Sequence, residues 1–557
     1  MYNLELDEIK NDAYRYAVKN AFLHKGKAEI KAVIGKVKAL HPEIELVKVM
    51  PLIKEIVEKI NSQDFTDIQA KYAELESSYE LKPKLKKEGL PELDWVDGTE
   101  VVTRFAPNPN GPFHLGSARA AILSHEYARK YGGKFILRLD DTDPKIKKPI
   151  DNAEKIFRDD LEWLGIKVDE LYFASDRLDI YYDYMRKLID MGKAYVCNCD
   201  SEEWRKKIKK EIACPCRDKE VKEQKEMFEE MIKHKLKEGE AVLRIKTDLH
   251  NKDPSVRDWW AAKIVDKPVH PRVEGKHVWP SYNFASAVDD HELGVTLVIR
   301  GQEHEQNKTK QEFMYKYLEW EYPHCFHTGR ISLEGLVLST SKISEGIQKG
   351  KYTGWDDPQI GTIQALKRRG FTAETLKKMI LEVGIKSSDT TVSMDTLIAM
   401  NKDLIGKVTR YPFIREPAIL DVDFCPETEV EISGRRISLK QGTQRFTVSK
   451  EEIKDLKPNT LVRLRHAYNV RIKDIGDFGV SAEYVSSGMI KNKPIISWLL
   501  DSADVVIWQI DNTEIIGTTE VSILDEPVDS HVFLDRLGYC RVDEREGNRL
   551  KLRFTHK

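Results

Sequence analysis

Residues 104–117 read RFAPNPNGPFHLGS, and this segment decides the fold class. It follows residues 100–105, whose β-branched content predicts a strand, and it leads into the alanine-rich residues 117–131, which predict a helix. A second strand is predicted over residues 134–139, after two glycines that end the helix. The order strand, turn, helix, strand is that of a βαβ unit, so we expect a parallel sheet with its ligand at the carboxyl ends of the strands.

The turn inside this segment has features suited to a phosphate ligand. Its prolines stiffen the backbone, while Gly111 and Gly116 leave room for a ligand to approach. His114 stands beside the predicted helix N-terminus, where free N–H groups and the helix dipole favour phosphate. The chain has neither G-x-x-x-x-G-K-[ST] nor a G-x-G-x-x-G segment opening a helix, which disfavours P-loop ATPases and dinucleotide-dependent dehydrogenases.

The composition of the 557 residues sets broad limits on the class of protein. At about 150 residues per domain we expect roughly four domains, and 41% hydrophobic with 33% charged residues excludes collagen-like, disulfide-scaffold and membrane-embedded proteins. The net charge of −2 supplies no overall positive field, so any nucleic-acid binding must be local. Seven cysteines, a charged N-terminal segment and no apolar run of about 20 residues predict a cytoplasmic protein without a membrane partner.

The composition and the spacing of apolar residues change several times along the chain. Helical spacing of apolar residues over 4–78 gives way to a lysine- and proline-containing linker at 82–97, and short alternating strands follow residue 407. We therefore predict a mixed α/β protein built around a Rossmann-like parallel sheet. Its predicted parts are a helical N-terminal extension with linker (1–97), the first half of the parallel-sheet domain (98–173), an inserted domain (174–279), the second half (280–345), a helical region (346–405) and antiparallel β-barrels (406–557).

Segment 104–117 resembles the HIGH signature of class I aminoacyl-tRNA synthetases, in the glutamyl and glutaminyl form where R-F-A-P-x-P-x-G precedes the signature histidine. Residues 339–343, STSKI, resemble the second signature of that class, the KMSKS loop. Both signatures depart from the consensus, because Ser117 replaces the last histidine of HIGH, while Ser339 and Ile343 replace the outer residues of KMSKS. Lys342 keeps its register.

The resemblance implies binding of ATP with Mg²⁺ between the two signatures. Attack of a carboxylate on the α-phosphate requires positive groups where charge accumulates, and His114 and Lys342 are the candidate catalytic groups for this. The full set of implied ATP contacts is Pro107, Asn108, His114, Gly116, Ser117, Ser341 and Lys342.

Three further segments resemble the amino-acid pocket of the glutamyl enzymes. The acidic run at 140–143, DDTD, has the composition of a divalent-metal cluster, but it more closely resembles the segment whose first acid holds the substrate α-ammonium. Asp143 is expected to be a turn residue. Residues 278–291 and 298–304 resemble the blocks that carry the pocket tyrosine and arginine. The implied glutamate contacts are Arg104, Asn108, Asp140, Tyr282, Ser286 and Arg300.

Arg300 separates the two nearest activities, because a guanidinium binds a γ-carboxylate bidentately, whereas an unpaired arginine buried against a neutral amide is costly. The resemblance therefore implies activation of glutamate and its transfer to the 3′-terminal ribose of tRNA(Glu), with tRNA(Gln) open as a second acceptor. It also implies acceptor-stem contacts from the insertion and anticodon contacts from the barrels. A glutamine–tRNA ligase and a catalytically silent tRNA-binding paralogue are the alternatives. For the N-terminal helices two roles stay open, docking of a protein partner and packing against the body of the protein.

Four of the seven cysteines lie in two C-x-C knuckles of the insertion. Four thiolates from two short knuckles can close a tetrahedral site for structural Zn²⁺, and the resemblance adds that some glutamyl enzymes carry a related zinc site there. Plain reduced cysteines are the alternative. The candidate ligands are Cys197, Cys199, Cys214 and Cys216.

Overall fold

The computed structural model describes residues 2–24, 26–41, 46–75, 90–98, 100–432, 435–476, 479–547 and 549–557. The chain divides into two compact units, Met1–Glu88 and Gly89–Lys557. Residues 82–89 of the predicted linker lie outside the described residues. None of the helices in the described ranges is both long enough and apolar enough to cross a lipid bilayer.

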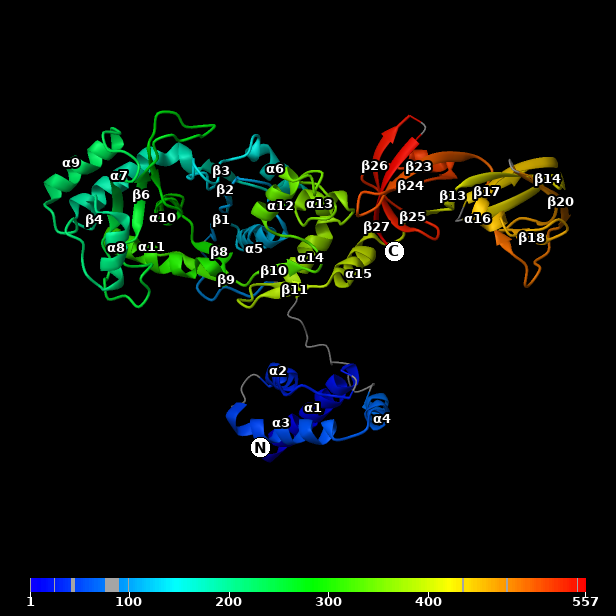
Figure 1. Cartoon of the computed structure of the whole chain (residues 1–557), viewed down its shortest axis with the longest axis horizontal. Coiled ribbons are helices and arrows are strands. Elements are labelled where there is room, and N and C mark those ends of the chain that lie inside the picture. The colour runs from blue at the N-terminus through cyan, green and yellow to red at the C-terminus, as the bar shows by residue number, and fades with distance from the viewer. Residues whose placement is uncertain are drawn as a thin grey trace. The chain divides into compact units, whose positions relative to one another are not determined.

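The first unit is helical, as the spacing of its apolar residues predicts (Figure 1). Within the described residues of this unit, four helices bury a shared core that includes Ala13, Ala17, Val33, Ile53 and Ile60. Their bounds are α1 Tyr2–Leu23, α2 Ile30–Leu40, α3 Leu46–Asn61 and α4 Phe65–Leu75.

A five-stranded parallel sheet forms the centre of the second unit and confirms the predicted fold class. Its strand order is β3-β2-β1-β8-β9, so the order reverses beside β1, and the crevice at such a switch point is where open α/β sheets bind ligands. The first strand is shorter than predicted, and the helix after it begins two residues earlier, because His114 caps it. The bounds are β1 Thr103–Phe105, α5 Leu115–Lys130, β2 Phe135–Leu139, α6 Ala153–Trp163, β3 Glu170–Phe173, β8 Leu297–Gly301, α11 Glu305–Leu318 and β9 His324–Thr328.

A four-stranded antiparallel sheet, in the order β4-β5-β6-β7, interrupts the parallel sheet between β3 and β8. Its last strand runs directly into α10, with only Ser281 between them, and Ser281 caps that helix by accepting a hydrogen bond from the Phe284 N–H. The core of this insertion is continuous with α10 and α11, since Trp279, Phe284 and Met314 belong to one buried cluster. The bounds are α7 Leu178–Asp190, β4 Ala194–Cys197, α8 Ser201–Lys209, α9 Val221–Ile232, β5 Val242–Ile245, β6 Trp260–Ile264, β7 Val278–Pro280 and α10 Tyr282–Glu292.

A helical region follows the parallel sheet and packs on α5. Leu366, Leu376 and Ile380 share a buried cluster with Leu115 and Ile122 of that helix. The bounds are β10 Ile331–Leu333, α12 Thr340–Gln348, α13 Ile363–Arg368, α14 Ala373–Val383, β11 Thr390–Val392 and α15 Met394–Ile405.

The C-terminal part consists of two seven-stranded, mainly antiparallel sheets with separate cores, which matches the predicted barrel texture (Figure 1). The first has the order β12-β25-β26-β27-β23-β24-β13, with bounds β12 Thr409–Tyr411, β13 Ile414–Arg415, β23 Ser502–Trp508, β24 Glu514–Glu520, β25 His531–Leu534, β26 Gly538–Glu546 and β27 Arg549–His556. The second has the order β21-β18-β19-β20-β14-β17-β22, with bounds β14 Pro417–Cys425, β17 Gly442–Ser449, β18 Leu461–Leu464, β19 Asn469–Gly476, β20 Gly479–Ser486, β21 Ile495–Ile496 and β22 Trp498–Leu499. Two smaller elements accompany the second sheet, the hairpin β15 Thr428–Ile432 with β16 Arg435–Leu439 and the helix α16 Lys450–Ile453.

Candidate functional site

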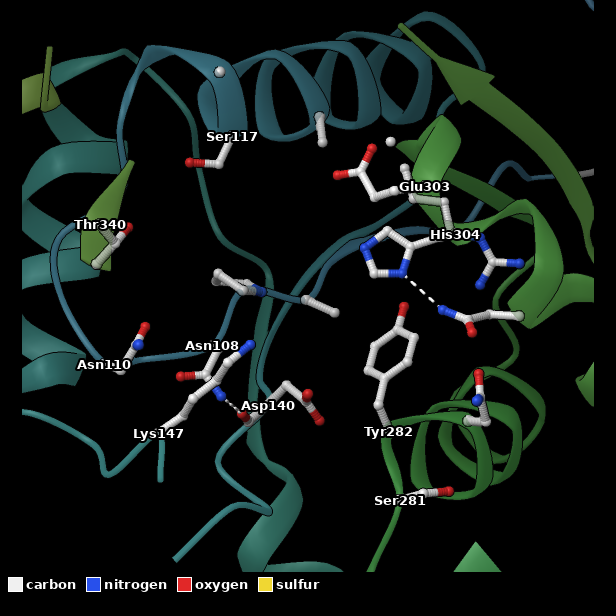
Figure 2. Close-up of a pocket in the computed structure, with 18 of the residues that line it drawn as sticks. Asn108, Asn110, Ser117, Asp140, Lys147, Ser281, Tyr282, Glu303, His304 and Thr340 are labelled. Carbon is white, nitrogen blue, oxygen red and sulfur yellow. Dashed lines mark hydrogen bonds between the residues drawn. The ribbon is translucent and has the colours of Figure 1, made fainter. Parts of the chain in front are cut away.

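A cavity of about 1210 Å³ opens at the carboxyl ends of β1, β2, β8 and β9, where the strand order reverses. Both signature segments contribute to its wall (Figure 2). The insertion contributes Trp204 and Trp259, among other residues. The predicted site residues that line it are Arg104, Pro107, Asn108, His114, Gly116, Ser117, Asp140, Tyr282, Arg300 and Ser341. Ser286 and Lys342 do not line it.

The proline-rich turn after β1 is tied to the end of β2 by hydrogen bonds. The Asp140 N–H donates to the Pro107 carbonyl at 2.8 Å, and the Asn108 amide donates to the Asp140 carbonyl at 2.9 Å. The Asn108 side-chain oxygen is buried without a partner. At Gly111, a Cβ atom would lie 2.6 Å from the Thr340 methyl group, so the two signature segments meet where only glycine fits.

His114 acts as the N-cap of α5. Its Nδ1 accepts the Ser117 N–H at 3.3 Å, and the His114 N–H donates to the Ser117 hydroxyl at 3.2 Å, which closes a capping box. Burial lowers the pKa of His114 to about 4, so the imidazole is neutral near pH 7 and its Nε2 carries the proton. The site therefore contains a neutral hydrogen-bond donor where the sequence predicted a positive group.

The second signature forms the start of a helix and not an open loop. Ser339 is the N-cap position of α12, and Thr340 and Ser341 reach the cavity wall. Lys342 is exposed on the first turn of α12. Ile343 is fully buried beside Tyr352, which explains why an apolar residue replaces the final serine of the consensus.

The three carboxylates of the acidic run after β2 contact different partners. Asp140 lines the cavity and accepts a hydrogen bond from Arg138 at 3.1 Å, while burial raises its pKa and the Arg138 charge opposes that shift. Asp141 accepts hydrogen bonds from the N–H and hydroxyl of Ser175, and Asp143 caps the following turn as predicted. These carboxylates do not converge, so within the described ranges the acidic run forms no metal cluster.

Helix α10 anchors two buried arginines of neighbouring strands, Arg104 in the cavity wall and Arg138 next to Asp140. Arg104 donates to the two oxygens of Asp290 at 2.9 and 3.3 Å, and Arg138 pairs with Asp289, which is fully buried. The hydroxyl of Ser286, 3.4 Å from Asp290, is also buried. The prediction that Ser286 contacts substrate is therefore not supported by its position, because the side chain points away from the cavity toward this anchor.

Arg300 ends strand β8 and is 4% exposed. Its guanidinium donates to His327 Nε2 at 3.3 Å, to Gln311 Oε1 at 3.1 Å and to the Tyr322 hydroxyl at 3.1 Å. Burial, followed by the Arg300 charge, lowers the pKa of His327. All three acceptors are therefore neutral, and among the described residues no carboxylate forms an ion pair with Arg300. This leaves a buried positive charge facing the cavity.

Tyr282 and His304 close the opposite side of the cavity from Asn108 and Asp140 (Figure 2). Their rings lie 5.3 Å apart between centroids, and the Asn307 amide lies 2.8 Å from His304 Nδ1. Burial, with the charges of Arg300 and Arg104, lowers the pKa of His304 to about 4. On this side the cavity wall thus combines a phenol and a neutral imidazole with the cation of Arg300 and the carboxylate of Glu303.

Comparison with known proteins agrees with this geometry. Residues 100–407 match the family model described as tRNA synthetases class I (E and Q), catalytic domain. The chain belongs to this family. It is 45% identical to a glutamate–tRNA ligase of Thermococcus kodakarensis and 46% identical to one of Pyrococcus abyssi, each over 99% of this chain and 100% of the relative. A glutamate–tRNA ligase of Methanobrevibacter smithii is 37% identical over the same shares.

This class I synthetase holds its four knuckle cysteines together in the insertion. The Sγ atoms of Cys197 and Cys214 lie 3.8 Å apart, those of Cys199 and Cys216 lie 3.6 Å apart, and all four lie within 4.8 Å of one another. All four are free thiols. Tetrahedral Zn–S bonds of about 2.3 Å place the sulfur atoms about 3.8 Å apart, so these side chains have the spacing of a zinc site.

Several functional side chains of the synthetase were absent from the sequence prediction. Asp289 and Asp290 could have been found in the sequence, because they are two adjacent acids in the quoted block 278–291 and can neutralise two arginines on neighbouring strands. Gln311, Tyr322 and His327 carried no such signal, since each contacts Arg300 from a different element.

Proposed function

We propose that this protein is a glutamate–tRNA ligase that activates L-glutamate with ATP and transfers it to the 3′-terminal ribose of tRNA(Glu). The observation that supports glutamate most directly is Arg300, a buried cation whose protein partners are all neutral. A γ-carboxylate supplies the missing negative charge and accepts the remaining guanidinium N–H groups, whereas a neutral amide leaves the charge unpaired.

In this proposal the other cavity residues orient the amino acid. Asp140 binds the α-ammonium, and Arg138 and Asp289 hold that carboxylate in place. Tyr282 borders the side-chain pocket, and Arg104, fixed by Asp290, adds a second cation to the wall. The α-carboxylate then faces the turn at 106–114, where ATP is proposed to bind.

Activation joins one α-carboxylate oxygen to the α-phosphorus of ATP and releases pyrophosphate, which gives glutamyl-adenylate. Mg²⁺ entering with ATP neutralises charge on the phosphates. His114 Nε2–H donates a hydrogen bond to the phosphates, and Lys342, next to the cavity-lining Ser341, supplies the cation for pyrophosphate. The 2′-hydroxyl of the terminal ribose then attacks the carbonyl carbon, and AMP leaves.

We also propose that Cys197, Cys199, Cys214 and Cys216 bind one structural Zn²⁺, because the thiols converge at the required spacing. The ion would join the two knuckles that flank α8. Its proposed contribution is to the fold of the insertion.

A charging assay tests the proposed function. The purified protein is incubated with ATP and with either glutamate or glutamine, using separately purified tRNA(Glu) and tRNA(Gln). Charging of tRNA(Glu) with glutamate supports the proposal, and any charging of tRNA(Gln) with glutamate shows a broader tRNA range. Charging with glutamine alone would identify a glutamine–tRNA ligase, and no charging would identify a silent paralogue.

A further inference from the structure

Segment 352–362 connects the two signature segments of the cavity wall through hydrogen bonds. The Gly361 N–H donates to the Val337 carbonyl at 3.1 Å, shortly before the second signature. The Gly361 carbonyl accepts the Leu115 N–H at 3.0 Å, at the start of α5. The backbone of one residue therefore links both signatures and sets the spacing between them.

Two aromatic side chains of the same segment pack against the signatures. The Trp355 ring lies so close to Gly111, in the first signature, that a Cβ atom there would be 2.9 Å from it. The Tyr352 ring is buried against α12, where a Cβ atom on Gly346 would be 2.5 Å from it. A shift of this segment would therefore move or release both signatures.

Asp357 holds the segment in its shape. Its fully buried carboxylate accepts hydrogen bonds from the N–H and hydroxyl of Thr353, at 2.9 and 3.0 Å, and from the Gln359 N–H at 2.9 Å. Burial acts to raise the pKa of this carboxyl, but the hydrogen bonds outweigh burial and hold the pKa below its usual value. Asp357 is therefore charged near pH 7, and its negative charge is stabilised by donors that are neutral.

A fourth donor to this carboxylate comes from the C-terminal part of the chain. Asn512, in the turn between β23 and β24, donates its amide N–H to Asp357 at 3.1 Å. The amide oxygen of Asn512 accepts a hydrogen bond from Arg553 of β27 at 3.0 Å. Because the amide is held at both ends, the charge of Arg553 strengthens the hydrogen bond to the buried carboxylate.

The contacts of segment 352–362 concern one side of the cavity. Figure 2 shows Asn110, Ser117 and Thr340, which belong to the turn after β1, to α5 and to α12, on the opposite side of the cavity from Tyr282 and His304. The first side is where ATP is proposed to bind, and the second borders the proposed glutamate pocket. A displaced segment is therefore expected to impair the use of ATP before that of glutamate.

We infer that Asp357, held by Asn512, is a positioning residue for ATP, because it fixes the segment that sets the distance between the two signatures. Asp357 does not line the cavity, so it acts through that segment and not by contact with the nucleotide. This inference rests on the proposed function, which supplies ATP as the substrate. It also gives the seven-stranded sheet that carries Asn512 a part in the geometry of the ATP site.

Two substitutions test the inference. Asp357→Asn keeps the size of the side chain but removes the charge and places an NH₂ group among hydrogen-bond donors. Asn512→Gly removes the amide without straining the turn, whose φ of +62° glycine adopts freely. The matched control is Asn492→Gly, the same substitution at an exposed turn position with φ +58° in the segment between β20 and β21.

Misplacement of reacting groups by about 1 Å can lower a rate about 100-fold. The kcat/KM for ATP is therefore expected to fall about 10- to 100-fold in Asp357→Asn, through a higher KM for ATP, and by a smaller factor in Asn512→Gly. The KM for glutamate is expected to stay close to that of wild type, and Asn492→Gly is expected to change none of these values.

The assay measures initial rates of tRNA(Glu) charging over ranges of ATP and of glutamate concentration, the Kd of ATP with Mg²⁺ by equilibrium dialysis, and Tm. Weaker use and binding of ATP in folded variants, with the KM for glutamate retained, supports the inference. A purely structural role would lower the folded fraction, and hence the apparent kcat, and leave both KM values and the Kd unchanged. That result would overturn the inference, as would an equal increase of both KM values.

Two further outcomes are also decisive. If Asp357→Asn does not fold, Asn512→Gly decides, because it leaves the carboxylate its three hydrogen bonds from Thr353 and Gln359. If wild-type protein binds ATP but charges no tRNA, the proposed function fails, whereas the Kd values for ATP still test the inference about Asp357.

Discussion

Removal of the Arg300 side chain tests the basis of amino-acid selection. In Arg300→Ala, the γ-carboxylate enters a buried cavity without its cation, and Gln311, Tyr322 and His327 lose a shared donor. Breaking one side of a buried, hydrogen-bonded charge pair costs about 2–5 kcal/mol. This corresponds to a decrease of roughly 30- to 5000-fold in kcat/KM for glutamate. The tyrosine hydroxyl still donates to Gln311 at 2.8 Å, so the loss of folding stability is expected to be smaller.

The assay is steady-state charging of tRNA(Glu) over a range of glutamate concentrations, with thermal unfolding as the folding control. Arg300→Lys provides a second variant that keeps the charge and loses the planar fork, and it is expected to fall between wild type and Arg300→Ala. A decrease in kcat/KM of less than threefold in folded Arg300→Ala would refute the assignment of the γ-carboxylate to this residue.

Three further predictions concern stability and metal content. Burial raises the pKa of Asp160 from 3.8 to about 7, so ionisation of this group destabilises the fold progressively from pH 4 to pH 7. Asp160→Asn should therefore raise Tm at pH 8, with a gain in the free energy of unfolding of at most about 4 kcal/mol, and leave Tm unchanged below pH 4. Metal analysis should find one zinc per chain in the wild-type protein, no zinc in Cys214→Ser and one zinc in the control Cys540→Ser. Wild-type protein that contains no zinc, although zinc was available during its preparation, would contradict the site. Gly133→Ala places a Cβ 2.3 Å from the Val101 carbonyl oxygen and should cost about 1–3 kcal/mol, measured by denaturant unfolding, whereas Gly488→Ala meets nothing within 4 Å and should leave the midpoint unchanged.

The sequence was sufficient for the fold class because its decisive signals are local. The βαβ unit around residues 104–117 can be predicted from strand and helix composition on either side of one turn. Element boundaries depend on contacts that composition does not reveal. The helix α5 starts at Leu115 because the His114 ring accepts the Ser117 N–H, and the start of β1 is set by its pairing with β2 and β8.

Which of the predicted site residues line the cavity also depends on how the fold brings distant segments together. Motif residues next to strand ends, such as Asp140 and Arg300, line the cavity because the parallel sheet brings those ends together. Ser286 does not line the cavity because its hydroxyl is directed toward Asp290, and Lys342 does not line it because its side chain is exposed on the first turn of α12. The charge of His114 could not be predicted either, since its pKa depends on how deeply the fold buries it.

The junction between β7 and α10 makes the insertion part of the amino-acid pocket. The last strand of the antiparallel sheet ends at Pro280, and Tyr282, two residues later, lines the cavity. Because only Ser281 separates β7 from α10, the connection is too short for the two elements to move independently. A rotation of the insertion would therefore move Tyr282, so a ligand that rotates the insertion is expected to change the shape of the proposed glutamate pocket.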